Sequence, residues 1–493
     1  MTIDPKDLSK FYFGSGNEKS SEGEEYKRGK HDEFYVNPSI AIQTATTVNT
    51  STSTSTSTST SNGSKMIVHG RGMVATKDIA AGECIFITPP TVGLDMDSIK
   101  SKFKESTNTM TLEDLAMEEL IDNMTKDIES RRDGENETAT LNPRINSFLC
   151  LMGSTKEKEK EVTIEILNGK EDSELWSAEE LKDLTRQGMK NIILKNAFGP
   201  DFITYDKMQA QWLSSSLSYT PPNILGVFPL AAMINHSCVP NAVRTFSNGS
   251  IMVAHACQAI PAGQEIVWSY IPPTQVMADR RRALKKRHGF LCKCERCMIE
   301  AKELRKDLLP MNLRQALDEA NKWNESMLDT SRIDETSKRQ LCAAAIHLEE
   351  TLFSSKSLSN EVKRHVRVGY TNLHFNYFNT MLAAAKEQKQ HQKQNVQELV
   401  LQSATQLHFA YCSSNNTSTE HLSVLHLCYE LATTATAGAA GNIKFWTEAM
   451  KRAHMTRYGP LGSNVSMIRS CMVHTRTILR QRDGYLQVKS NFL

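Results

Sequence analysis

Three cysteines, Cys292, Cys294 and Cys297, stand within six residues of one another, and this cluster limits the fold more than any other feature. Three thiolates at this spacing can converge on one tetrahedral zinc ion, but a closed structural site needs four ligands. The fourth must come from elsewhere in the chain, and Cys238, in a polar turn before Pro240, is the natural candidate. The alternative is that the thiols are ordinary core cysteines, although such dense spacing is rare outside metal and redox sites.

The first 64 residues are polar and end in an alternating Ser/Thr tract from Ser51 to Ser61. Such a tract cannot bury enough apolar surface to offset an ordering entropy of about 1–2 kcal/mol per residue. We therefore predict that residues 1–64 are a disordered tail and that folded structure begins near Met66.

Short β-prone runs separated by glycines follow Met66, and they predict strand, turn and strand. The phrase at residues 78–85 returns in similar form at residues 259–266, with Gly82 and Gly263 at matching places. In both copies the glycine permits the turn that leads into a strand.

Two regions carry helical patterns. Residues 101–190 form an acidic segment with helical stretches at 112–124 and 178–194. We interpret this segment as a solvated helical insertion, at about 95–190, rather than a substrate-steering surface. After residue 300 the chain becomes amphipathic and helical. For example, apolar residues recur at spacings of four and three at Leu341, Ala345, Leu348 and Leu352. We predict an α+β region at 65–300 and an all-α domain at 301–493, with tetratricopeptide-like stacked hairpins as the expected arrangement.

The formal net charge of +2 gives no global reason to expect a nucleic-acid partner. The basic stretch at residues 280–287 is local, and we predict that it is the solvated face of a helix rather than a nuclear import signal or a nucleic-acid patch. The longest apolar run, Ile224 to Ile234, contains Gly226 and Pro229 and is too short to cross a bilayer, which needs about 20 residues. With eleven cysteines, most of them single, we expect reduced thiols, no membrane association, and a cytoplasmic or nuclear protein.

Four motifs in order resemble the SET-domain methyltransferases. Residues 235–241, Asn-His-Ser-Cys-Val-Pro-Asn, resemble the signature N-H-S-C-x-P-N, and residues 263–270 resemble the G-x-E-I-x-x-x-Y that follows it. Residues 70–73 resemble the opening G-x-G-L, and Phe290 with the cysteine cluster resembles the post-SET F-x-C-x-C-x-x-C. The helical domain after residue 300 is similar to that of the SET-and-MYND (SMYD) family.

This resemblance implies a β-clip fold of short strands, in which the strand at Asn235 passes beneath a neighbouring loop in a knot-like arrangement. The insertion at about 95–190 would interrupt the SET domain of residues 65–300, and residues of about 280–300 would form its post-SET zinc segment. The residues it assigns to S-adenosylmethionine are Arg71, Asn196, Asn235, His236, Tyr270 and Phe290. The zinc ligands would be Cys238, Cys292, Cys294 and Cys297, and Tyr270 would position the reacting groups in catalysis.

The chain departs from the SMYD pattern in two places. A MYND zinc finger needs several cysteines, but the corresponding region, about 95–190, has only Cys150. In addition, His288 stands where the family usually has tyrosine, and an imidazole there could either alter the pH profile or pack as a neutral aromatic ring.

The leading hypothesis is an enzyme that methylates protein lysine side chains, of histones or of other proteins, with S-adenosylmethionine as cofactor and zinc in a structural role. The alternative is a catalytically weak or inactive SET scaffold whose helical domain binds protein partners. A zinc-dependent nucleic-acid binder is the least favoured, because the charge is nearly neutral and the basic cluster is local.

Overall fold

The computed structural model describes residues 35–43, 71–105, 112–132, 151, 186–199, 224–247, 251–305, 307–324, 333–387, 393–412, 421, 424–425, 428–429 and 440–458. Among them lie eleven short strands: β1 Tyr35–Val36, β2 Ile40–Gln43, β3 Gly72–Ala75, β4 Cys84–Thr88, β5 Val92–Asp95, β6 Ala197–Phe198, β7 Ile224–Val227, β8 Asn235–His236, β9 Ala242–Ser247, β10 Ile251–Ala256 and β11 Val267–Trp268.

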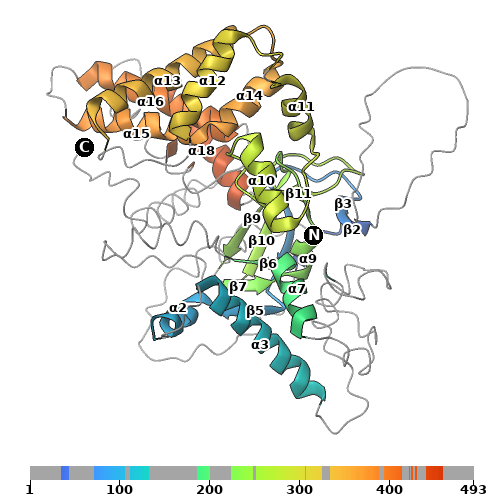
Figure 1. The fold of residues 1–493 in the computed structure, drawn as a ribbon. Helices are drawn as coiled ribbons and strands as arrows, with labels where there is room; N and C mark the ends of the chain where they lie inside the picture. The colour runs from blue at the N-terminus through green and yellow to red at the C-terminus, as the bar shows by residue number, and fades with distance from the viewer. Residues whose placement is uncertain are drawn as a thin grey trace, which may run out of the picture.

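The helices before residue 304 are α2 Met96–Glu105, α3 Leu112–Arg132, α7 Arg186–Asn196, α9 Pro229–Ala232, α10 Met277–His288 and α11 Glu295–Glu303. The later ones are α12 Met311–Asn324, α13 Glu335–Ser354, α14 Asn360–Gly369, α15 Thr371–Glu387, α16 Lys393–Cys412 and α18 Ala440–Tyr458. Figure 1 shows the later helices gathered at one end, the strands in the middle, and α2 and α3 at the opposite end. The predicted mixture of short strands and helices before residue 300, followed by helices alone among the described later residues, is confirmed.

The strands form four small sheets. One has four antiparallel strands in the order β1-β4-β10-β9, and another has three in the order β5-β7-β6. Strands β2 and β3 pair antiparallel, whereas β8 and β11 pair parallel. The small sheets place several turns and strand ends close together, which is where the predicted site residues fall.

The two similar phrases in the sequence pair with each other. The backbone N–H groups of Ile79 and Ile260 each donate to the other residue's carbonyl at 2.9 Å. Gly82 has φ of 84° and Gly263 has φ of 81°, a left-handed conformation that side-chain-bearing residues rarely adopt. The glycines therefore make the two turns, as predicted.

The expected disordered tail is wrong for residues 35–43. Tyr35 and Val36 pair with Ile87 and Phe86, and the strand from Ile40 pairs with β3. This short β-prone run folds because it completes the edges of two sheets formed by later residues. The remaining residues of 1–64 lie outside the described part of the chain.

The helical domain and the four-stranded sheet share one hydrophobic core. Ile87 of β4 and Val253 of β10 pack in the same cluster as Phe378 of α15 and Trp446 of α18. A second cluster, which includes Leu341 and Leu348, joins α12 to α15 within the domain. The four residues predicted to line one face of this helix, at positions 341, 345, 348 and 352, are all fully buried. The tetratricopeptide-like arrangement itself stays a prediction.

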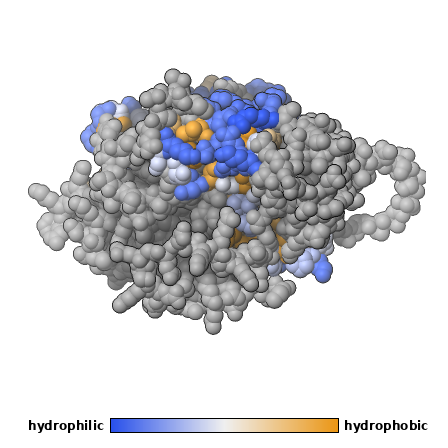
Figure 2. Space-filling view, turned by 90° about the horizontal axis from the view of Figure 1, so that it is seen from below, coloured by the Kyte–Doolittle hydropathy of each residue, from blue (hydrophilic) through white to orange (hydrophobic). Residues whose placement is uncertain are grey.

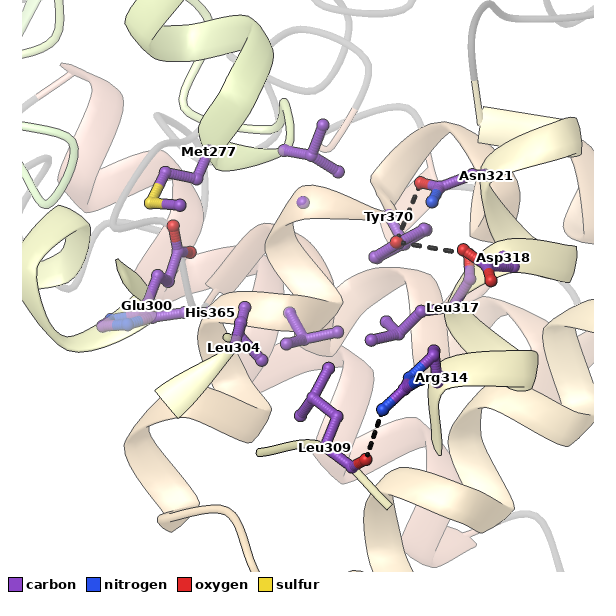
Figure 3. A pocket seen from close by; sticks show the side chains of 13 residues that line it. Met277, Glu300, Leu304, Leu309, Arg314, Leu317, Asp318, Asn321, His365 and Tyr370 are labelled. Atoms are coloured by element: carbon purple, nitrogen blue, oxygen red, sulfur yellow. Dashed lines mark hydrogen bonds between the residues drawn. The ribbon is translucent and has the colours of Figure 1, made fainter. Parts of the chain in front are cut away.

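A cavity of about 160 Å³ lies where the segment of residues 276–304 meets the helical domain. Its wall includes Met277 and Glu300 from one side and Tyr370 from the other (Figure 3). The Tyr370 hydroxyl is directed toward Asn321 and donates to its side-chain oxygen at 2.9 Å.

On the face shown in Figure 2, most of the described surface is hydrophilic, with small hydrophobic areas between. Among the described residues, no helix is both long and apolar enough to span a bilayer.

Candidate active site

The parallel pair β8 and β11 is the centre of the candidate site. Asn235 lies beside Val267, and His236 lies beside Trp268. The next residue, Ser237, donates its N–H to the Trp268 carbonyl at 2.9 Å. Because the segment of residues 235–238 is held directly against residues 267–270, their side chains meet in one place, as the predicted crossing of strand and loop requires.

Asn235 ties three distant segments together. Its amide nitrogen donates to the Arg71 carbonyl at 2.9 Å and to a carboxylate oxygen of Glu265 at 2.6 Å. Both bonds use the amide nitrogen of Asn235 as donor. The structure therefore brings the predicted residues Arg71 and Asn235 together, and it adds Glu265, which is buried.

His236 holds the strand pair to the cysteine cluster. Its Nδ1 accepts from the Tyr270 N–H at 3.0 Å, so the proton of a neutral ring is on Nε2, which lies 3.3 Å from the Cys238 sulfur. Burial lowers the pKa of His236 to about 3. The ring is therefore neutral near pH 7 and is positioned by both nitrogens, and its contact with S-adenosylmethionine stays a prediction.

An aromatic cluster surrounds this point. The Tyr270 ring centre lies 5.3 Å from that of His236, 4.9 Å from His288 and 6.5 Å from Phe290. The Tyr270 hydroxyl donates to the Ile234 carbonyl at 2.8 Å. Burial raises its pKa to about 12, so the phenol keeps its proton at neutral pH.

Burial also lowers the pKa of His288, and nearby Arg287 lowers it further. The ring packs beside Tyr270 and Phe290 and is neutral near pH 7. Of the two interpretations of His288, these contacts favour a neutral ring packed against its aromatic neighbours over a group that alters the pH profile.

The four predicted metal ligands form one cluster. The sulfur atoms of Cys238, Cys292, Cys294 and Cys297 all lie within 4.8 Å of one another. The Cys238 sulfur is 3.9 Å from that of Cys292 and 3.6 Å from that of Cys297. A tetrahedral zinc ion with Zn–S bonds of about 2.3 Å requires sulfur atoms about 3.8 Å apart, so the cluster fits zinc. Hydrogen bonds from Cys238 and Cys292 lower the pKa of Cys297, whereas hydrogen bonds with the other three cysteines raise that of Cys238.

Two buried arginines beside the cysteines were missed by the sequence reasoning. Arg280 donates to the sulfurs of Cys238 at 3.2 Å and Cys297 at 3.5 Å, and it forms an ion pair with Glu300 at 2.5 Å. Arg296 donates to the other oxygen of Glu300 at 2.9 Å. The prediction that the basic stretch 280–287 is wholly solvated is therefore wrong at Arg280, which is fully buried, because Glu300 and the sulfur atoms compensate its charge.

Arg244 is a further residue without a clear signal in the sequence. Its guanidinium lies 5.2 Å from the Phe198 ring centre and 5.0 Å from that of Trp268. Burial lowers the pKa of Arg244 to about 10, and Tyr270 acts in the opposite direction. A cation thus lies close to Tyr270, held against two aromatic faces.

Asn196 ends α7 and is buried. Its amide nitrogen donates to the Ile192 carbonyl at 2.7 Å, within its own helix. The next two residues form β6, and the Phe198 ring centre lies 5.7 Å from that of Trp268. Asn196 thus lies directly before β6, the strand that packs on β11. Its contact with a cofactor stays a prediction.

Residues 70–271 match the protein family described as SET domain. The chain therefore contains a SET domain, and three of the four motifs, at residues 70–73, 235–241 and 263–270, lie within the matched range.

Relatives of the SMYD kind match parts of the chain. SET domain-containing protein SmydA-8, isoform B, of Drosophila melanogaster is 42% identical over 74 residues, covering 15% of this chain and 16% of that protein. A SET and MYND domain-containing protein of Dictyostelium discoideum is 31% identical over 144 residues, 27% of this chain and 40% of that protein. N-lysine methyltransferase SMYD2-B of Xenopus laevis is 38% identical over 77 residues, 16% of this chain and 18% of that protein. The predicted SMYD-type resemblance is confirmed, and the chain spans less than half the length of each of these relatives.

Solved structures show a weaker likeness. The crystal structure of the SET domain of LSMT bound to lysine and AdoHcy is 13% identical, with a TM-score of 0.22 over 87% of this chain and 89% of that one. This superposition is too poor to support a conclusion about the site. The site is therefore described from the residues of this chain alone.

Proposed function

We propose that the protein is an S-adenosylmethionine-dependent methyltransferase that acts on lysine side chains of proteins. The observation that carries the proposal is the convergence of Asn235, His236, Tyr270 and Phe290 around the parallel strand pair. The relative from Xenopus laevis is named an N-lysine methyltransferase, which supports a protein lysine as the acceptor. Whether the substrate is a histone or another protein stays open.

The residues present fit the cofactor in two respects. Phe290 is half-buried, 5.9 Å from His236, and can stack on a flat aromatic base. The side-chain oxygen of Asn235 can accept from an ammonium group. When bound, S-adenosylmethionine supplies a methyl group on a positively charged sulfur.

Tyr270 is the catalytic residue in this proposal. Its phenol is protonated near pH 7, so it acts as a neutral dipole rather than as a base. The hydroxyl donates its proton to the Ile234 carbonyl, which leaves the oxygen lone pairs to accept from the amine or from the polarised methyl group. The oxygen thereby fixes the line of attack, which an in-line displacement requires.

The aromatic cluster favours the neutral form of the incoming lysine side chain. An amine has an ordinary pKa of about 10.4, and loss of water disfavours its charged form. The rings of Tyr270, His288 and Phe290 would exclude water from the amine, and the neutral His288 adds no charge that would hold the proton. The lysine would release its proton to bulk water as it enters, and the neutral amine would then form the N–C bond as the S–C bond breaks, so a dedicated carboxylate base is not required.

We further propose that the four-cysteine cluster binds a structural zinc ion. The cluster holds Phe290 next to Cys292 and reaches His236 through Cys238, so it fixes one wall of the site. The helical domain, which shares a core with the sheet, is proposed to bind protein partners.

The test combines cofactor binding with methyl transfer. Calorimetry of the zinc-analysed full chain with S-adenosylmethionine is expected to give one binding site per chain. Transfer of labelled methyl groups to a library of lysine-containing peptides is expected for the wild type. For Tyr270→Phe we expect retained binding and the loss of most turnover, whereas Tyr429→Phe, a half-buried tyrosine of the helical domain, should behave as the wild type.

Two results would count against the proposal. A folded, zinc-loaded protein that fails to bind S-adenosylmethionine would favour the inactive scaffold. Unchanged turnover in Tyr270→Phe would remove Tyr270 from the active site.

A further inference from the structure

A second group of metal-ligating side chains lies in the helical domain, apart from the four-cysteine cluster. His408 and Cys412 are four residues apart on α16, so they share one face of the helix. His421 lies opposite them, and its Nε2 is 2.9 Å from the His408 Nδ1. The Cys412 sulfur lies 3.7 Å from the same Nδ1 atom. One ligand atom from each of the three residues falls within 4.8 Å of the others.

These distances are close to those of a tetrahedral metal site. With Zn–N bonds of about 2.05 Å and a Zn–S bond of about 2.3 Å, tetrahedral angles separate two nitrogens by about 3.3 Å and a nitrogen from a sulfur by about 3.6 Å. The His408–Cys412 distance matches this spacing. The two histidine nitrogens would need to separate by about 0.4 Å, which small rotations of the rings can supply.

The histidines are held in place by packed aromatic rings. Tyr411 stacks on His421 at a centroid distance of 4.8 Å, and Trp446 and Phe445 lie edge-on to His408 at 5.6 Å. Burial lowers the pKa of His408 to about 4, and nearby Arg452 lowers it further. Burial, together with His408, also holds the pKa of His421 well below its ordinary value. Both rings are therefore neutral near pH 7, the form in which imidazole binds a metal.

A hydrogen-bonded histidine pair with a purely structural role is the competing interpretation. One ring would donate and the other would accept, which needs no third group. The histidine pair does not need Cys412, yet the Cys412 sulfur lies close to the His408 Nδ1 that takes part in the pair.

The group is reached from outside through a cavity. A hollow of about 530 Å³ is lined by His408, Cys412 and His421 and also by Glu448 and Arg452. Cys412 is exposed, so an ion can enter from this side. Three protein ligands leave one position of a tetrahedral ion for an external ligand.

We propose that His408, Cys412 and His421 form a binding site for a divalent transition-metal ion, Zn²⁺ in the first place, with one coordination position open to the cavity. Imidazole and thiolate together are the ligands that Zn²⁺ takes, whereas Mg²⁺ and Ca²⁺ prefer oxygen ligands. The site is independent of the proposed methyltransferase activity.

Metal content of the full chain tests the proposal. We expect two zinc ions per chain in the wild type and one in each of Cys412→Ser and His421→Gln. Cys342→Ser, which changes a half-buried thiol of α13 in the same domain, should retain two. Cys294→Ser should also lose one ion, so the double variant Cys294→Ser with Cys412→Ser should hold none. One zinc ion in the wild type that is unaffected by Cys412→Ser would overturn the proposal.

A second measurement needs no variant, and the alkylation rate of Cys342 in the same domain reports whether metal depletion unfolds that domain. Because Cys412 is exposed, iodoacetamide should alkylate it in metal-depleted protein. After addition of Zn²⁺ we expect at least tenfold slower alkylation of Cys412, measured by mass spectrometry, and an unchanged rate at Cys342. Equal rates at Cys412 with and without Zn²⁺ would refute the site, and neither measurement depends on methyl transfer.

Discussion

Replacing Glu300 by glutamine should strongly destabilise the protein, because one carboxylate compensates two buried arginines. The side chains of Arg280 and Arg296 are 0% and 1% exposed, and that of Glu300 is 3% exposed. Burial disfavours the charge of Arg280, while Glu300 and the cysteines raise its pKa above the ordinary value. Removing one partner of a buried ion pair costs about 3–5 kcal/mol. This loss corresponds to a more than hundredfold rise in the unfolded-to-folded ratio.

Urea unfolding of the zinc-loaded chain, followed by tryptophan fluorescence, measures this effect. Glu300→Gln should move the transition to lower urea and release zinc earlier, since Arg280 also donates to two cysteine sulfurs. Asp307→Asn is the matched control. It breaks a pair with Arg305 at 2.6 Å in which both side chains are about 60% exposed, and we expect no measurable loss there. A loss below about 1 kcal/mol in Glu300→Gln would refute the claim that the two guanidiniums depend on this carboxylate.

Three further predictions concern pH, packing and cofactor binding. Burial lowers the pKa of His255 to about 3, so its contribution to stability is complete above pH 6.5 and is lost as the pH falls toward 3, because the unfolded chain takes up the proton first. Between pH 7 and pH 5 the wild type should therefore lose about 2 kcal/mol more than His255→Gln in urea unfolding, and equal losses would contradict this. Gly226→Ala would place a Cβ atom 2.9 Å from both the Pro90 Cβ and the Val92 carbonyl oxygen. Thermal unfolding should therefore show a loss of about 1–3 kcal/mol in the free energy of unfolding. An unchanged unfolding midpoint would mean that β5 shifts to accept the added atom. Phe290→Ala should weaken S-adenosylmethionine binding at least tenfold in calorimetry with zinc content unchanged, and unaltered affinity would exclude the proposed stacking.

Local signals in the sequence predicted much of the fold. Glycines at 82 and 263 marked the turns, and the spacing of Leu341 and Leu348 marked a buried helix face. The strand at Tyr35 was missed because its pairing partner, Ile87, is more than fifty residues away and the intervening tract is polar. Two or three residues of β structure gain stability only from such a partner, which no local pattern reveals.

The parts of the candidate site that follow from residue spacing in the sequence were predictable. The parts that depend on charges brought together by folding were not. The cysteine cluster assembled as predicted because the segment of residues 292–297 brings three thiols to Cys238. Arg280 was misjudged because a run of basic residues is usually solvated, and only the folded chain shows that Glu300 faces it. The pairing of Arg296 with Glu300, four residues apart on one helix, was readable and could have indicated a charge network.

The insertion that follows β5 leaves and re-enters the SET domain at the same place. Asp95, the last residue of β5, pairs with Ile224 at the start of β7, and β6 pairs with the other edge of β7. The chain between β5 and β6 therefore leaves and re-enters one three-stranded sheet, and its two ends are fixed on opposite edges of β7. Closure entropy rises only logarithmically with length, by about 0.6 kcal/mol for each doubling. This junction can consequently accept modules of very different length, provided that each new module restores the apolar face that α2 and α3 bury in the core shared with Trp268 and packed by Tyr270.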